Sequence, residues 1–85
     1  RMKITWTRTA REQYIYWQQM DKQKLKRINE LIKHVLREPF SGIGNPEALK
    51  HDLQGYWSRR IDSEHRLVYK YIENQLIIVS CRYHY

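Results

Sequence analysis

The hydrophobic periodicity of this chain changes at Pro39, and that change constrains the fold more than any other feature. Upstream, apolar residues recur every three or four positions, as on one face of a helix: Leu25, Ile28, Ile32, Val35 and Leu36. Pro39 has no backbone N–H and disfavours helical geometry at Glu38, so the helix should end there. Beyond residue 55, Val, Ile and Tyr alternate with polar residues, as in strands. The chain therefore predicts helices first and a sheet afterwards.

Turn and cap residues divide the first half into elements. Alternation of apolar and polar residues predicts a short strand at residues 3–6. A helix should follow to about Met20, capped by Thr7 or Thr9. Asp21 suits the N-cap of the next helix, so the two helices should form a hairpin. The apolar face expected on the first helix is Ala10, Tyr14, Trp17 and Met20.

The second half predicts a loop and then a meander of strands. Residues 40–55 hold all three glycines, which indicates a long loop, and long loops in compact domains are usually functional. Strands are expected at 56–61, 65–72 and 75–83, with turns at 62–64 and 73–74. The order β-α-α-β-β-β predicts an α+β fold, a helical hairpin packed on a small, curved, mainly antiparallel sheet.

The chain has 85 residues, and we expect residues 1–85 to form a single domain. Arg1 precedes Met2, so we expect Met2 to be the natural first residue and Arg1 a remnant of expression. Cys81, the single cysteine, cannot form an internal disulfide, and we expect a buried thiol rather than a nucleophile. There is no apolar run of about 18 residues and no signal peptide. We therefore expect a cytoplasmic protein with no membrane partner.

Charge narrows the range of partners. The net charge is +7, and residues 1–46 hold ten Lys and Arg against four Asp and Glu. A basic domain of this size indicates an anionic partner, most readily nucleic acid, although an acidic protein segment or a membrane surface also fits. The plainest alternative is a charge that only maintains solubility.

The residues that could carry chemistry lie in the loop, the hairpin and the C-terminus. Phosphate-binding glycine loops, zinc-ligand spacings and nucleophile elbows are absent from the sequence. Metal-free RNA cleavage needs a base for the 2′-hydroxyl, an acid for the leaving 5′-oxygen and cations for the developing charge. The chain offers such groups without a metal or another cofactor: Glu47, Lys50, His51, Arg59, Arg60, Arg66, Arg82, His84 and Tyr85.

The hairpin at residues 62–64 admits two registers. A three-residue loop places Arg60 opposite Arg66, and such like charges repel unless an anion bridges them. A two-residue loop at residues 63–64 separates them. Two solvated arginines on an outer face remain the plainer interpretation.

The C-terminus ends without a polar tail, and a last strand could hold it in place. Strand alternation would put Tyr83 and Tyr85 on one face, and Arg82 and His84 on the other. Histidine suits proton transfer near neutral pH, and an aromatic ring can stack on an unpaired RNA base. Aromatic core filling beside an exposed histidine explains the same pattern.

Four segments together resemble the YoeB toxins of the RelE/ParE superfamily: Trp17–Lys33, Glu38–Ile61, Glu64–Tyr69 and Cys81–Tyr85. The pattern PExLKxxLxGxWSRRIxxEHRLVY is far more specific than a short motif. The similarity runs from Met2 to Tyr85.

The resemblance implies the toxin half of a type II toxin–antitoxin module, an endoribonuclease that cuts mRNA in the ribosomal A site. It implies a YefM-like antitoxin, the ribosome with its rRNA, and mRNA as partners, and it suggests a homodimer. It assigns catalysis to Glu47, Arg66 and His84, supported by Lys50, Arg60 and Tyr85. The alternatives are a ParE-like gyrase toxin and a non-catalytic binding module.

The protonation states of the side chains at neutral pH suggest which group is the base and which is the acid. A carboxylate is already deprotonated at neutral pH, so we expect Glu47 to be the general base. Imidazole can carry a proton there, so we expect His84 to be the general acid. Tyr85 should stack on or orient the substrate.

Overall fold

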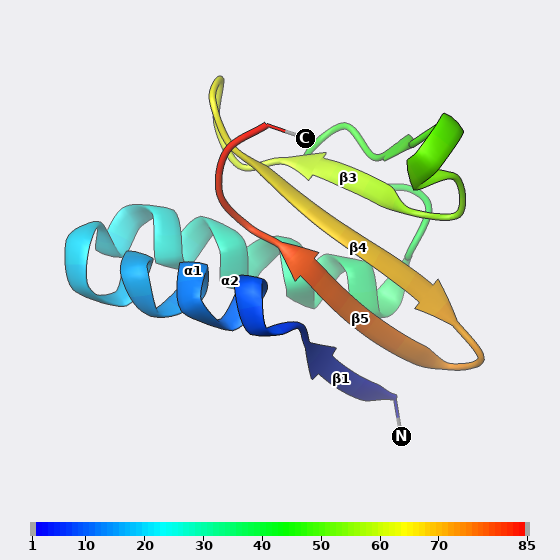
Figure 1. Ribbon diagram of the computed structural model, residues 1–85, viewed down its shortest axis with the longest axis horizontal. Helices are drawn as coiled ribbons and strands as arrows, with labels where there is room; N and C mark the ends of the chain where they lie inside the picture. The colour runs from blue at the N-terminus through cyan, green and yellow to red at the C-terminus, as the bar shows by residue number, and fades with distance from the viewer. Residues whose placement is uncertain (1, 85) are drawn as a thin grey trace.

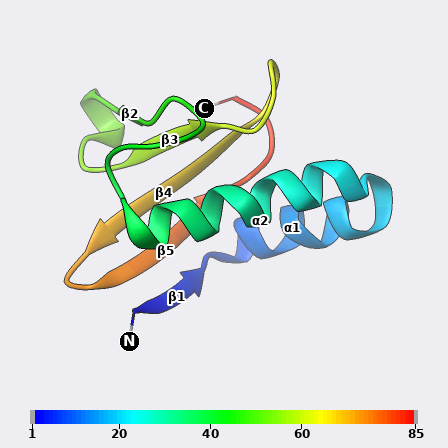
Figure 2. The ribbon, with the colours of Figure 1, turned by 180° about the vertical axis from the view of Figure 1, so that it is seen from behind.

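The computed structural model describes residues 2–84. Its sheet has the strand order β1-β5-β4-β3-β2, in which β1 runs parallel to β5 and the other neighbours are antiparallel. Helices α1 and α2 lie side by side on one face of this sheet, behind it in Figure 1 and in front of it in Figure 2. The predicted α+β architecture is confirmed. The elements are β1 (Lys3–Trp6), α1 (Arg8–Met20), α2 (Lys22–Arg37), β2 (Glu47–Ala48), the 3-10 turn η1 (His51–Leu53), β3 (Trp57–Arg60), β4 (Arg66–Ile72) and β5 (Gln75–Ser80).

The helical hairpin begins and ends where the cap residues predict. Thr7, rather than Thr9, caps α1: its Oγ1 accepts the Ala10 N–H at 3.1 Å and donates to the Val79 carbonyl at 2.9 Å. One Asp21 carboxylate oxygen accepts two N–H groups of the first turn of α2. Helix α2 ends at Arg37, two residues before the proline. Local chemistry therefore sets these boundaries.

The core lies between the helices and the inner face of the sheet. It includes Ala10 and Trp17 of α1 and the expected face of α2, with Leu25 and Leu36 only partly buried. Leu31, outside the predicted stripe, is fully buried at its centre. Met20 was predicted to face the core and is 64% exposed, because it is the last residue of α1. Among residues 2–84, no helix is both long and apolar enough to cross a membrane.

The expected loop at residues 40–55 is more ordered than predicted. It contains the two-residue strand β2, which pairs with β3, and the turn η1. Upstream of β2, the Gly44 carbonyl accepts the Arg60 N–H at 2.6 Å. Gly44 has φ +83°, and an added Cβ would lie 2.7 Å from Leu31 Cδ2. Glycine is thus required where the loop passes between β3 and α2.

Arg59 ties this loop to the sheet from inside. It is fully buried and points toward the helices, whereas the next residue, Arg60, is exposed. Its Nε donates to the Tyr69 hydroxyl, and its two Nη atoms donate to loop carbonyls. The Tyr69 hydroxyl donates in turn to the Pro39 carbonyl at 2.6 Å, and burial raises the pKa of this phenol, which keeps it neutral. The loop carbonyls bound by Arg59 are those of Glu38, Ser41 and Ile43.

The predicted last strand at residues 75–83 is too long. Strand β5 ends at Ser80, and Tyr83 has φ +67°, which no strand residue adopts. Arg82 and His84 therefore do not share a strand face. The Arg82 guanidinium instead lies over the Tyr16 ring, with its carbon 3.6 Å from the ring centroid.

Candidate functional site

Strand register gathers three of the expected residues on the outer face of the sheet, away from the helices. Leu67 and Tyr69 of β4 are buried beneath the helices, so alternation turns Arg66 to the other face. Arg60 pairs directly with Arg66, which confirms the three-residue loop and excludes the shorter one. Glu47 pairs with Ser58, two positions before Arg60 on the same strand and hence on the same face.

The paired arginines concentrate positive charge at the end of β3. Residues directly opposite in an antiparallel pair have Cβ atoms roughly 4.5–5.5 Å apart, so two guanidinium groups there repel one another. Asp62, in the connecting loop, does not neutralise them through its carboxylate. One of its oxygens lies 2.8 Å from Lys24 Nζ, and the other accepts the N–H groups of Glu64 and His65. An anion such as an RNA phosphate would relieve this repulsion.

Burial works to raise the pKa of Asp62, but these hydrogen bonds outweigh it and lower the pKa to about 2. The carboxylate is therefore charged at neutral pH. The Lys24–Asp62 pair also ties α2 to the β3–β4 hairpin. The hairpin that carries Arg66 is thus fixed at its tip.

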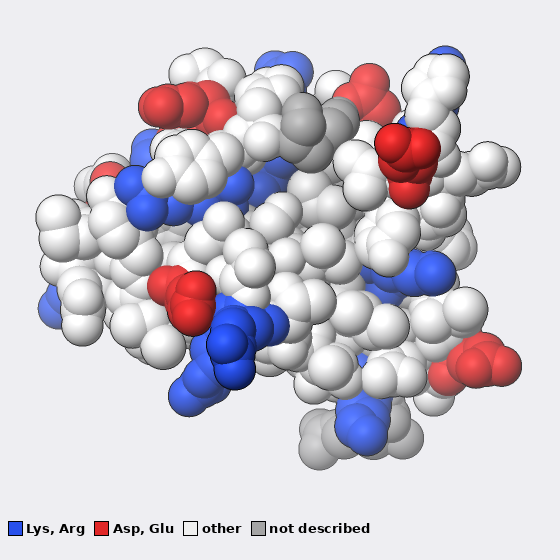
Figure 3. Space-filling model, viewed as in Figure 1, with Lys and Arg blue, Asp and Glu red and all other residues white. Residues whose placement is uncertain are grey.

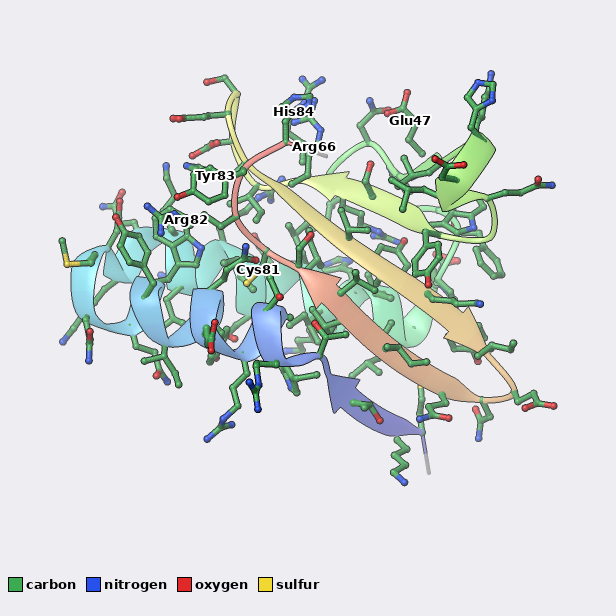
Figure 4. The ribbon with its side chains drawn as sticks, viewed as in Figure 1. Glu47, Arg66, Cys81, Arg82, Tyr83 and His84 are labelled. Atoms are coloured by element: carbon green, nitrogen blue, oxygen red, sulfur yellow. The ribbon has the colours of Figure 1, made fainter. Side chains whose placement is uncertain are left out.

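The C-terminal segment returns across the end of the hairpin, where Tyr83 binds the backbone of Arg66. Trp17 Nε1 donates to the Cys81 carbonyl at 2.9 Å, and the Cys81 N–H donates to Gln13 Oε1 at 2.7 Å. The Arg66 N–H then donates to the Tyr83 carbonyl at 3.1 Å. In Figure 4, Arg66 and His84 are drawn next to each other, with Glu47 along the same edge of the molecule. Tyr85 lies outside the described residues.

Glu47 and Lys50 share one depression. It measures about 300 Å³ and is lined by residues of β2 and η1, including His51. A larger hollow of about 590 Å³ lies elsewhere, on the exposed face of α2 between Lys26, Arg27 and Lys33. Of these two, the smaller depression is the one lined by Glu47, which shares a sheet face with Arg60 and Arg66.

The charge distribution leaves no single basic patch on the face of Figure 1. Figure 3 shows Lys and Arg side chains in separate groups around a largely uncharged centre. Within the described residues, no three His, Cys, Asp or Glu side chains gather as a metal site would require. Cys81 is fully buried, as expected, and burial raises the pKa of its thiol to about 12, so it is not a nucleophile.

The sequence did not reveal the roles of the residues that hold the site in place, although Arg59 stood among the candidates for chemistry and Trp17 on the expected core face. His65, Trp17 and Gln13 fix the C-terminal segment, and Arg59 fixes the loop. Each acts on a partner far along the chain, which periodicity cannot reveal. The one available signal was composition: an arginine or histidine at an inward-facing strand position must find polar partners.

Comparisons with known proteins agree on one family. The sequence model for YoeB-like toxins of bacterial type II toxin–antitoxin systems matches residues 6–85. Toxin YoeB of Escherichia coli K12 is 55% identical over 84 residues, which cover 99% of this chain and 100% of that protein. Two solved structures from Staphylococcus aureus, a YoeB–YefM heterotetramer and a YoeB dimer, are each 52% identical to the chain. Both cover 100% of this chain and 99% of their own, with TM-scores of 0.92 and 0.93.

Proposed function

The chain belongs to the YoeB-like toxins of bacterial type II toxin–antitoxin systems, and from this we propose that it is a ribosome-dependent endoribonuclease that cuts mRNA in the A site. The observation that carries the proposal is the convergence of Glu47, Arg60 and Arg66 on one sheet face with residue 84 at its edge. A pure binding module needs no such set of base, acid and cations.

The proposed reaction is an attack of the 2′-hydroxyl on the adjacent phosphorus. Glu47 takes the hydroxyl proton, and His84 gives a proton to the departing 5′-oxygen. The products are a 2′,3′-cyclic phosphate and a 5′-hydroxyl end. Arg66, supported by Arg60 and Lys50, stabilises the charge that grows on the phosphate oxygens, an effect on the order of 10²-fold or more for each such donor. We assign Tyr85 to stacking on the substrate, and we propose that the reaction needs no metal.

A substrate with sulfur at the 5′-bridging position separates the acid from the base. Its leaving group needs no proton, so the defect of His84→Ala should largely disappear while that of Glu47→Ala persists. Rescue of Glu47→Ala instead would reverse the two roles. EDTA in reactions whose ribosomes remain intact should leave the wild-type rate unchanged; loss of activity there would refute the metal-free mechanism.

Mapping of mRNA 5′ ends in a purified translation system tests the function itself. Cleavage should occur at a fixed position relative to the ribosomal A site and should nearly vanish on naked mRNA, because the ribosome supplies the orientation that so small a protein lacks. Equal cutting of naked mRNA would refute ribosome dependence. Pulse labelling in cells separates the alternatives. Loss of protein synthesis indicates the nuclease, loss of DNA synthesis indicates a gyrase toxin, and no effect on either synthesis indicates a binding module.

We propose that the chain also forms a homodimer and binds an acidic, YefM-like antitoxin in the cytoplasm. The net charge of +7 should steer that encounter, so the association rate should fall as salt rises from roughly 50 to 500 mM. A salt-independent rate would contradict a mainly electrostatic encounter. Sedimentation should give twice the 10.6 kDa chain mass at micromolar concentration, and a monomer alone would contradict the dimer.

A further inference from the structure

His65 immediately precedes Arg66 of the proposed site and lies on the inner side of the sheet, against Trp17 of α1. It is 8% exposed, and its ring packs edge-on against Trp17 with 4.9 Å between centroids. Its Nδ1 accepts the backbone N–H of Tyr83 at 2.7 Å. The residue that follows it is Arg66, which alternation turns to the outer face.

His65, just before β4, and Arg66, its first residue, thus bind both backbone groups of Tyr83. The His65 side chain binds the N–H, and the Arg66 backbone N–H binds the carbonyl at 3.1 Å. Tyr83 has φ +67°, a left-handed conformation that a bulky residue keeps only where its surroundings enforce it. Since β5 has already ended at Ser80, these two hydrogen bonds set the direction in which the chain continues to His84.

The acceptor fixes the tautomer of the imidazole. Only an unprotonated ring nitrogen accepts an N–H, so Nδ1 must be bare and the proton of neutral His65 must sit on Nε2. One Glu64 carboxylate oxygen lies 3.7 Å from Nε2. The geometry therefore requires one particular form of His65.

We propose that His65 is a positioning residue for RNA cleavage: through Nδ1 it orients Tyr83 and so sets the place of His84 relative to Arg66. This inference rests on the proposed nuclease function. His65 touches no reacting atom in this scheme. Its effect should appear in the chemical step and not in ribosome binding, because a small misplacement of a catalytic group can lower a rate on the order of 10²-fold.

Two variants separate the hydrogen bond from ring packing. Asn in His65→Asn carries its amide oxygen where His65 has Nδ1, so it keeps the acceptor and loses the ring. Phe in His65→Phe keeps a ring against Trp17 and loses the acceptor. With saturating ribosomes, single-turnover cleavage should fall roughly 10- to 100-fold in His65→Phe and stay within about threefold of wild type in His65→Asn. Ribosome affinity should be unchanged in both.

Three outcomes would overturn the inference: wild-type rates in both variants, equal losses in both, or a larger loss in His65→Asn than in His65→Phe. Nitrogen-15 NMR of the wild-type protein tests it independently of activity and of variant folding. At neutral pH, His65 should carry its proton on Nε2, and the Tyr83 amide should exchange slowly. Protonation on Nδ1 would refute the hydrogen bond from the Tyr83 N–H to His65. Wild-type protein that cuts no ribosome-bound mRNA would instead refute the proposed function, which these spectra do not test.

Discussion

Arg59→Met tests whether a buried cation holds the loop that carries Glu47. Arg59 donates to the Tyr69 hydroxyl and to three loop carbonyls, at 2.5–3.1 Å. A hydrogen bond from a charged donor contributes roughly 1.5–3 kcal/mol, so the four together set an upper limit near ~12 kcal/mol. Methionine fills much of the same volume, removes the desolvation penalty of the guanidinium, and leaves carbonyls that can turn partly to water. We therefore expect a loss of about 3–4 kcal/mol.

That loss should lower the Tm by roughly 12–30 °C, since 1 kcal/mol corresponds to about 4–8 °C in a domain of this size. The assay is thermal unfolding followed by circular dichroism, at one fixed protein concentration because dimerisation would affect the Tm. Arg60→Met is the matched control: the side chain is exposed, so its Tm should change by less than about 3 °C while mRNA cleavage falls. A Tm for Arg59→Met within about 4 °C of wild type would refute the role of the buried cation.

Three further experiments test the Asp62 ion pair, the burial of Cys81 and the close approach at Gly44. Asp62→Asn keeps the acceptor for the turn but loses the ion pair with Lys24, and should cost about 1 kcal/mol at pH 7 after allowance for partial exposure. Because the pKa of Asp62 is lowered to about 2, that difference should be complete above about pH 4 and vanish as the pH falls through 2; a gap that persists at pH 2 would contradict it. The buried Cys81 thiol should resist alkylation at pH 8 until the protein unfolds, and rapid labelling of native protein would count against its burial. Gly44→Ala should destabilise more than Gly55→Ala: both have positive φ, but only at Gly44 would the new Cβ meet Leu31, so equal losses would rule out the contact.

Local signals in the sequence predicted local structure well. Thr7, Asp21 and Pro39 act on backbone groups within four residues of themselves, so their roles are visible in the sequence. The sequence left two registers open for the turn after β3, and the structure decides between them by pairing Arg60 with Arg66. The site assignments came mainly from family resemblance and remain predictions.

Long-range structure could not be predicted in this way. Strand β2 has two residues, too few for an alternating pattern, and exists because β3 lies beside it. The C-terminal segment follows a strand pattern in sequence but leaves the sheet after Ser80, where hydrogen bonds to His65, Trp17 and Gln13 take over. These partners are 18, 64 and 68 positions away in the chain.

Side chains alternate between the two faces of a strand, and at this site the two faces carry residues with different roles. Arg59 and His65 face the helices, and each fixes one segment of the site: the loop before Glu47, or the chain before His84. Their neighbours Arg60 and Arg66 face outward, where RNA would lie. Loss of activity therefore does not identify which residues contact RNA, because a variant at either kind of position can abolish cleavage. Only paired measurements of stability, tautomer and rate separate the residues that hold the site from those that act in it.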